Sequence, residues 1–134
     1  MRYIMLIYSE ERAAEMSAEE ICQLTERHKK LMEETARKGI LLGAEPLGRT
    51  STATTVRMAQ DGKPLITDGP FAETKEALAG YYILECPNLD EAIEWAAKIP
   101  TSCRGGAGCI EIRPMPGLSK RQPAPVGEHA GAGH

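Results

Sequence analysis

The chain opens with Arg2-Tyr3-Ile4-Met5-Leu6-Ile7-Tyr8, in which every position after the first is apolar or aromatic. Alternate side chains of a β-strand point to opposite faces, so this segment presents apolar residues on both faces. A strand covered on one side only would alternate apolar with polar residues. The segment therefore predicts a strand that is covered on both sides.

A long amphipathic helix is predicted next. Ser17 and Glu20 have the spacing of a capping box, in which each side chain bonds the other residue's backbone amide. The helix is expected to run to about Lys38, and Gly39 fits its end. Its apolar stripe consists of Ile21, Leu24, His28, Leu31, Met32 and Thr35. One side of this helix is therefore expected to pack against the sheet.

Further strands and a second helix follow. Strands are predicted from residue 40 and over residues 52–58, 63–67, 79–86 and 109–113. Asp61-Gly62 indicates a β-hairpin between the second and third of these. A helical turn is expected over 72–78, and a second helix is expected between an Asn88 cap and Pro100.

This order predicts the α+β class, as a ferredoxin-like βαββαβ fold with an additional β-hairpin. The sheet is antiparallel, with two helices on one face. Strands that are apolar on both faces would leave the other face exposed as a larger hydrophobic surface than soluble monomers usually carry. A second copy, packed sheet against sheet about a two-fold axis, would cover it. We therefore expect a homodimer, a dimeric α+β barrel.

Length and charge limit the alternatives. The 134 residues suffice for one domain, predicted over residues 1–115, and residues 116–134 are expected to be a flexible tail rich in Pro, Gly and Ala. The net charge of −3 predicts no nucleic-acid partner. The apolar run at the N-terminus is too short to span a membrane and lacks a cleavage site, so a cytoplasmic protein is expected.

No pattern in the sequence predicts a metal or a cofactor. Cys22, Cys86, Cys103 and Cys109 lack the spacing of a zinc site, and they are expected to be reduced thiols. A disulfide between Cys103 and Cys109 is the alternative for this pair. No nucleotide-binding fingerprint is present, since the glycine-rich stretch at 105–108 precedes a strand and lacks the lysine of a P-loop.

One nine-residue stretch resembles the signature of a known family. It is Asp68-Gly69-Pro70-Phe71-Ala72-Glu73-Thr74-Lys75-Glu76, followed by Gly80-Tyr81-Tyr82. This is similar to the DGPF branch of the YCII-related proteins, and the first strand, the second helix and the last strand also match, over residues 1 to about 115. The resemblance implies a dimeric α+β barrel with a cleft near the dimer interface. It also implies a bacterial protein of unknown function, often encoded beside sigma factors of the extracytoplasmic-function type.

His28 and Asp68 are the candidate catalytic residues. His28 lies on the apolar stripe of the first helix, where it is either a core histidine or a general acid or base, because imidazole titrates near neutral pH. The resemblance favours the second interpretation, since YCII-like proteins are thought to pair a helix histidine with an aspartate. Asp68 would hold the ring as the carboxylate of a catalytic triad does. Alternatively, Asp68 is a turn residue before Gly69-Pro70, and Phe71 an anchor.

Three further residues are candidate ligand contacts. Glu111 and Arg113 alternate with Ile110 and Ile112, so they are expected to point away from the helices, toward the dimer side. There they would form ion pairs or bind an anionic ligand. Tyr81, in the strand over 79–86, is the third candidate.

Two functions fit these observations. The first is a cofactor-independent small-molecule enzyme with a His28–Asp68 acid/base pair in a cleft at the dimer interface. The second is a non-catalytic dimer that binds a ligand or a partner in a regulatory setting linked to sigma factors. The sequence names no substrate, and the fold alone does not decide between the two.

Overall fold

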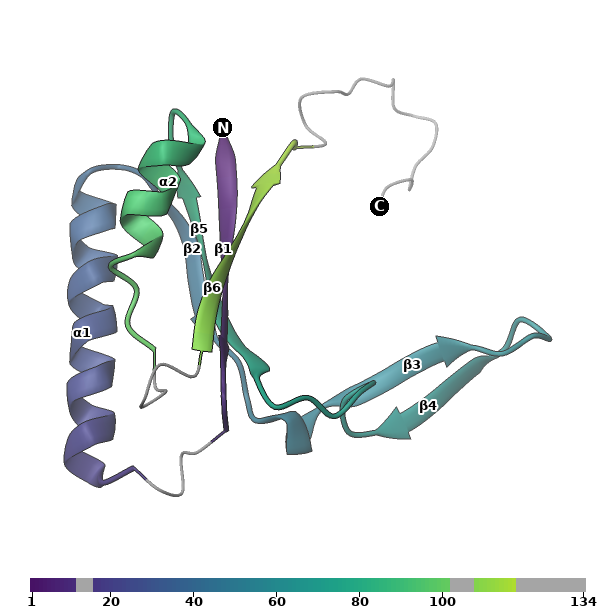
Figure 1. Ribbon diagram of the computed structural model, residues 1–134. Coiled ribbons are helices and arrows are strands. Elements are labelled where there is room, and N and C mark those ends of the chain that lie inside the picture. Colours follow the sequence, from purple (N-terminus) through teal and green to yellow (C-terminus); the bar gives the residue numbers. More distant parts are fainter. Residues whose placement is uncertain (12–15, 102–107, 118–134) are drawn as a thin grey trace.

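The computed structural model describes residues 1–11, 16–101 and 108–117, and it confirms the predicted α+β class. The elements are, in order, β1 (Arg2–Ser9), α1 (Ala18–Arg37), β2 (Leu41–Pro46), the 3₁₀ turn η2 (Thr50–Thr52), β3 (Thr54–Met58), β4 (Pro64–Asp68), β5 (Ala77–Glu85), α2 (Leu89–Ala96) and β6 (Gly108–Met115). Four strands form one antiparallel sheet, and β3 and β4 form a separate hairpin (Figure 1). This arrangement is a ferredoxin-like fold with an added hairpin.

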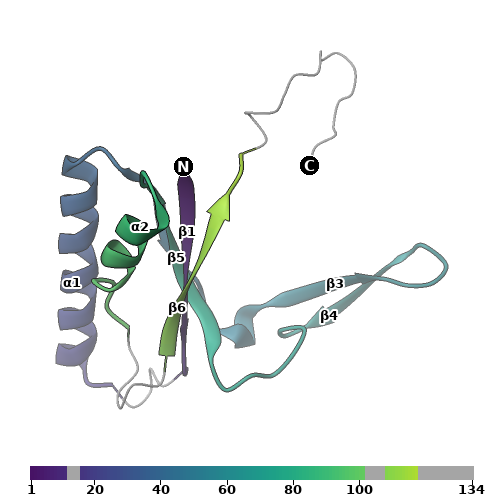
Figure 2. The ribbon, with the colours of Figure 1, turned by 45° about the horizontal axis from the view of Figure 1, so that its top comes forward.

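β1 is an inner strand of the main sheet, and one of its two faces is buried. The sheet has the strand order β2-β5-β1-β6, so β1 lies inside it, between β5 and β6. Tyr3, Met5 and Ile7 are buried, and the residues between them are partly exposed. Both helices of the described chain lie on one side of the sheet (Figures 1 and 2). Tyr3, Met5 and Ile7 belong to this side, because they share a buried cluster with residues of both helices. The opposite side of the sheet, which we call the open face, is covered by no helix of residues 1–11, 16–101 or 108–117.

The hydrophobic core lies between this sheet and the helices. Its buried members are Tyr3, Met5, Ile7, Leu31, Tyr82, Leu84, Cys86, Ala92, Ala96 and Ile99. The strands supply the larger share, and α2 contributes small alanines that allow it to approach the sheet closely. The core therefore accounts for one apolar face of β1 and β5 but not for the other.

The predicted capping box begins α1. The amide of Glu20 donates to Ser17 Oγ at 3.1 Å, and the amide of Ser17 donates to Glu20 Oε1 at 2.9 Å. The buried stripe is narrower than predicted, because Ile21 and Met32 are exposed. Residues 24, 28, 31 and 35 lie within about 60° of one another around the helix axis, at about 100° per residue. Ile21 and Met32 lie at one edge of this stripe, where solvent reaches them.

The predicted hairpin is present as an extended arm, residues 54–68. Gly62 has a φ of 84°, which the turn at Asp61-Gly62 requires, and the amide of Lys63 donates to Asp61 Oδ1 at 3.0 Å. The arm projects from the side of the sheet opposite the helices and away from the rest of the chain (Figures 1 and 2). The strand predicted from residue 52 begins at Thr54, because residues 50–52 form η2.

The helical turn predicted over 72–78 is wrong. Residues 69–76 are irregular, and Ala77 and Leu78 begin β5, where they pair with Ser9 and Tyr8 of β1. Thr74 Oγ1 donates to the carbonyl of Glu76 at 2.7 Å, a local bond that competes with a helical hydrogen-bond pattern.

Some predictions concern residues outside the described part of the chain. They include the tail beyond residue 117, Cys103, and the glycine-rich stretch at 105–107. Within the described residues, no helix is both long and apolar enough to cross a membrane.

Candidate functional site

His28 lies on α1 with its ring against Tyr82 of β5. Its Nδ1 is 2.9 Å from the Tyr82 hydroxyl oxygen, and the two rings stack with centroids 6.0 Å apart. The hydroxyl also lies 3.5 Å from the backbone carbonyl of His28, a longer and weaker contact. Tyr82 is a buried core residue, while His28 is partly exposed. The histidine is therefore held by a neutral phenol.

Burial shifts the pKa of both groups. Desolvation lowers the pKa of His28 below 6.5, and the nearby positive charge of Arg27 lowers it further. Desolvation raises the pKa of Tyr82 to about 12. Both groups are therefore neutral at pH 7, which suits a buried contact between helix and sheet.

Asp68 lies elsewhere in the structure. It is the last residue of β4, it pairs with Thr54, and it is exposed. In the described part of the chain, no hydrogen bond or ion pair joins Asp68 to His28. The arm that carries Asp68 projects from the side of the sheet opposite α1 (Figure 1). A single chain therefore does not bring the two predicted catalytic residues together, and their pairing stays a prediction.

The turn that follows Asp68 closes the base of the arm. Gly69 has a φ of 95°, and its amide donates to the carbonyl of Ala53 at 2.7 Å. The carbonyl of Gly69 accepts from Thr55 Oγ1 at 2.7 Å. Phe71 is not an anchor within this chain, because 76% of it is exposed. These contacts give the start of the signature a structural role.

The three candidate ligand contacts share the open face. Leu6 of β1 is paired with Tyr81 on one side and with Glu111 on the other, so Tyr81, Leu6 and Glu111 form one row across the sheet. Ile83, Ile4 and Arg113 form the next row. The structure thus confirms that Glu111 and Arg113 point away from the helices.

Glu111 and Arg113 form an ion pair on β6. Arg113 Nη2 lies 3.2 Å from Glu111 Oε2, and Arg113 Nε lies 3.3 Å from the same oxygen. The Arg113 side chain is largely exposed and that of Glu111 is partly exposed, so solvent weakens this attraction. A guanidinium has five N–H donors, and this geometry leaves several of them for another acceptor.

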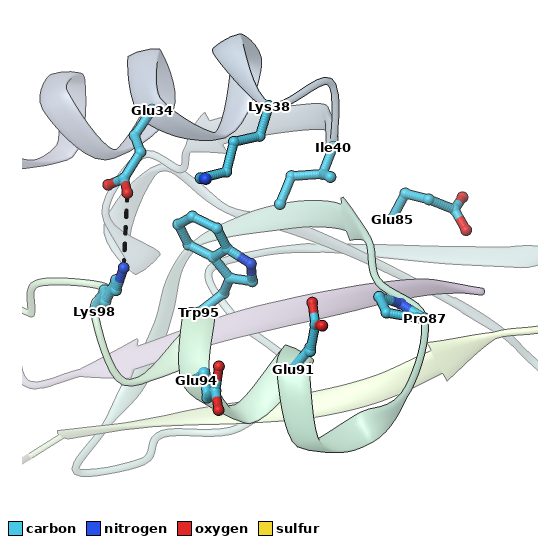
Figure 3. A pocket seen from close by; sticks show the side chains of 9 residues that line it. All are labelled: Glu34, Lys38, Ile40, Glu85, Pro87, Glu91, Glu94, Trp95 and Lys98. Carbon is cyan, nitrogen blue, oxygen red and sulfur yellow. Dashed lines mark ion pairs between the residues drawn. The ribbon is translucent and has the colours of Figure 1, made fainter.

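One cleft lies on the other side of the molecule, between the end of α1 and α2 (Figure 3). Its volume is about 380 Å³, and charged side chains predominate in its walls. Lys98 lies 4.5 Å from the centre of the Trp95 ring and 3.7 Å from Glu34. The ammonium group therefore occupies the aromatic face that a cationic ligand would use. None of the candidate residues named above lines this cleft.

A smaller cleft of about 120 Å³ lies against the signature segment. Its walls are Glu11, Thr50, Pro70, Ala72, Glu73, Thr74 and Ala77. Glu11 accepts from the Thr50 hydroxyl at 2.6 Å and from the Thr50 amide at 2.7 Å, and these bonds lower the pKa of its carboxyl. Lys75 lies 3.7 Å from Glu10. The residues that follow β1 thus contact Lys75 of this segment and the neighbouring turn at Thr50.

The structure also locates the cysteines and tests for metal ligands. Cys22, Cys86 and Cys109 carry free thiols, and burial raises the pKa of Cys86. Within the ranges that the structure describes, no three side chains of His, Cys, Asp or Glu gather closely enough to hold a metal ion.

Comparison with known proteins agrees with this architecture. The profile of the YCII-related domain matches residues 1–116. The chain belongs to the YCII-related family. An uncharacterised protein of Rhizobium meliloti (strain 1021) is 41% identical over 66 residues, which are 49% of this chain and 52% of that protein. The match thus spans about half the length of this relative, and the assignment to the DGPF branch stays a resemblance.

Sequence reasoning missed the residue that contacts His28. Tyr82 and Leu84 are two residues apart in β5, so both side chains point to the helix-covered face. This alternation was visible in the sequence. The contact itself depends on which turn of α1 lies over which strand, and no motif indicates that.

Proposed function

We propose that this YCII-related chain is a non-catalytic homodimer that binds a small organic molecule between two sheets. The observation that carries the proposal is the open face, where rows of apolar side chains end at the Glu111–Arg113 ion pair. The sigma-factor setting implied by the DGPF resemblance suits a ligand-responsive regulatory protein. The ligand and the second copy are both part of the proposal.

The composition of the open face supports the dimer. Ile4, Leu6, Tyr8, Tyr81 and Ile83 lie on this face and are only partly buried within one chain. Fully burying a side chain of this size contributes roughly 1.5–3 kcal/mol. Two such faces in contact about a two-fold axis would bury both sets at once.

The chemistry of the same face supports the ligand. Tyr81 and Leu6 offer apolar area beside Glu111, and Arg113 offers donors that match the geometry of a carboxylate. We infer that the ligand is a flat, largely apolar compound that carries one carboxylate. Its ring would lie on the apolar rows, and its carboxylate would bond to Arg113.

Catalysis by His28 is the second candidate. The observation in its favour is that the Tyr82 hydroxyl fixes the imidazole, because an oriented ring is one requirement of a general base. Against it, the ring is partly buried against Tyr82, and this burial lowers the pKa of His28. The enzyme hypothesis also requires Asp68 to reach His28, and no contact joins these two residues within one described chain.

Light scattering and a ligand titration test the proposal. We expect a dimer at micromolar concentration and a binding site for benzoate, used as a probe and followed by NMR chemical shifts of the β1, β5 and β6 amides. Arg113→Gln should weaken binding at least about tenfold, since hydrogen bonds to charged groups contribute about 1.5–3 kcal/mol. Arg37→Gln, an exposed arginine in the last turn of α1, is the matched control.

The outcomes separate the two candidates. His28→Gln should leave benzoate binding unchanged if the site is the open face. A monomer that binds no benzoate would contradict the proposal. A dimer in which His28→Gln alone abolishes binding would move the site to α1 and favour the enzyme.

A further inference from the structure

The arm formed by β3 and β4 has no core of its own. These two strands pair only with each other, as a separate two-stranded sheet. An isolated hairpin is at best marginally stable in water unless another surface covers it. Four of its apolar residues are nevertheless more than half exposed: Val56 at 60%, Met58 at 67%, Leu65 at 53% and Ile66 at 64%.

The register of the hairpin gathers most of these side chains on one face. Val56 is paired with Ile66, and Met58 is paired with Pro64. Paired residues point to the same side of a two-stranded sheet, so these four residues form one continuous apolar face. The arm thus presents an uncovered apolar surface in addition to the open face of the main sheet.

We infer that the arm is a clasp that lies across the open face of a second copy and forms one wall of the ligand site there. This inference rests on the proposed homodimer and adds the arm to it. Phe71, at the base of the arm and 76% exposed, would be covered by the same contact.

The partner of the arm is a second copy of this chain, because each chain carries both an arm and an open face, and the two match in size. A five-residue strand is about 17 Å long, and four strands are about 14 Å wide between the outer two axes. An arm therefore suffices to cross the sheet. The arm lies on the side of the sheet away from the helices, as the open face does, and it extends away from its own sheet (Figure 2). A two-fold axis would let each copy give one arm and receive one.

The arm also explains how a flat sheet interface could enclose a ligand. Two sheets in direct contact leave little space between them, whereas an arm that enters at one end holds them apart there. The space would be lined by the rows that end at Glu111 and Arg113 and closed by Val56 and Ile66 of the second copy.

Isotope-filtered NOE spectroscopy on the full chain tests the clasp directly. Labelled and unlabelled protein are mixed, so that only contacts between copies give signals. We expect contacts from the methyl groups of Val56 and Ile66 to those of Leu6 and Ile83. Contacts confined to open-face residues would overturn the clasp but leave the dimer intact. The absence of any contact between copies would overturn the dimer itself.

A matched pair of variants provides the second measurement. Ile66→Thr combined with Val56→Thr keeps β-branched residues in both strands and removes apolar area from the arm. We expect the dimer dissociation constant to rise at least about tenfold by sedimentation equilibrium. Ile93→Thr, on an exposed position of α2 at 49% exposure, should leave it unchanged. Equal effects of the arm and control variants would overturn the clasp.

Discussion

The Nδ1 of His28 and the hydroxyl oxygen of Tyr82 lie 2.9 Å apart and join α1 to β5 across 54 residues of sequence. The contact joins a partly exposed helix residue to a core residue of the sheet, so it is a structural link as well as a candidate site. Both partners are neutral at pH 7, and burial opposes a charge on either of them. Acid and alkali should therefore both weaken the folded state.

His28 makes the protein sensitive to mild acid. Its pKa is lowered from 6.5 in the folded state, so the unfolded chain takes up a proton more readily. The stabilising contribution is complete above pH 6.5 and is lost as the pH falls below that value. Urea denaturation between about pH 5 and pH 7 should show decreasing stability, and His28→Gln should flatten the curve. The lowered pKa of Glu11 acts only below its reference of 4.5. An equally steep loss in His28→Gln would contradict this assignment.

Tyr82 has the opposite pH dependence. Its pKa is raised from 10.0 to about 12, so the unfolded chain ionises first as the pH rises. The contribution of Tyr82 to stability should be constant up to pH 10 and fall between that value and about pH 12, whereas Cys86, whose pKa is raised from 9.0, acts from a lower pH. Ultraviolet absorbance at high pH should show a late step from Tyr82, and Tyr82→Phe should remove it. A late step that persists in Tyr82→Phe would show that another tyrosine causes it.

The main elements were predictable because each has a local cause. One half of the apolar pattern of β1 is buried under the helices, and the Ser17–Glu20 capping box marks the start of α1. Asp61-Gly62 correctly predicted the hairpin turn. The alternation of β6 correctly placed Glu111 and Arg113 on the face without helices. None of these features requires knowledge of distant contacts.

What the sequence did not predict depends on distant contacts. The partner of His28 is set by the way α1 lies over β5, and the exposure of Phe71 is set by the direction of the arm. The apparent helical turn at 72–78 was overridden when Ala77 and Leu78 paired with β1. Pairing to a neighbouring strand outweighs a weak local helix preference.

Gly80 should tolerate no side chain. A Cβ at this position would lie 2.9 Å from the carbonyl oxygen of Glu45 and 3.3 Å from Pro46 Cα, and both are backbone atoms of the neighbouring strand. We expect Gly80→Ala to lower the free energy of unfolding by about 1–3 kcal/mol in urea denaturation at pH 7. In Gly43→Ala the nearest atom would be the flexible Ile83 Cδ1 at 3.8 Å, so this control should change stability by about 0.5 kcal/mol or less. Similar losses in both variants would indicate a general sensitivity of β2 and β5 instead of this contact.

Asp68→Asn should leave the titration of His28 unchanged. Asp68 is exposed at the end of β4, whereas the His28 ring is held by Tyr82 on the helix-covered face of the sheet. NMR of the histidine ring protons from about pH 4 to pH 9 spans the reference value of histidine. The titration should follow the wild-type curve in Asp68→Asn and shift in Tyr82→Phe, where the hydrogen bond to Nδ1 is lost. A lower His28 pKa in Asp68→Asn would mean that the carboxylate stabilises the imidazolium. Since one chain does not bring these residues together, that outcome would require an approach from a second copy and would favour the enzyme over the binding module.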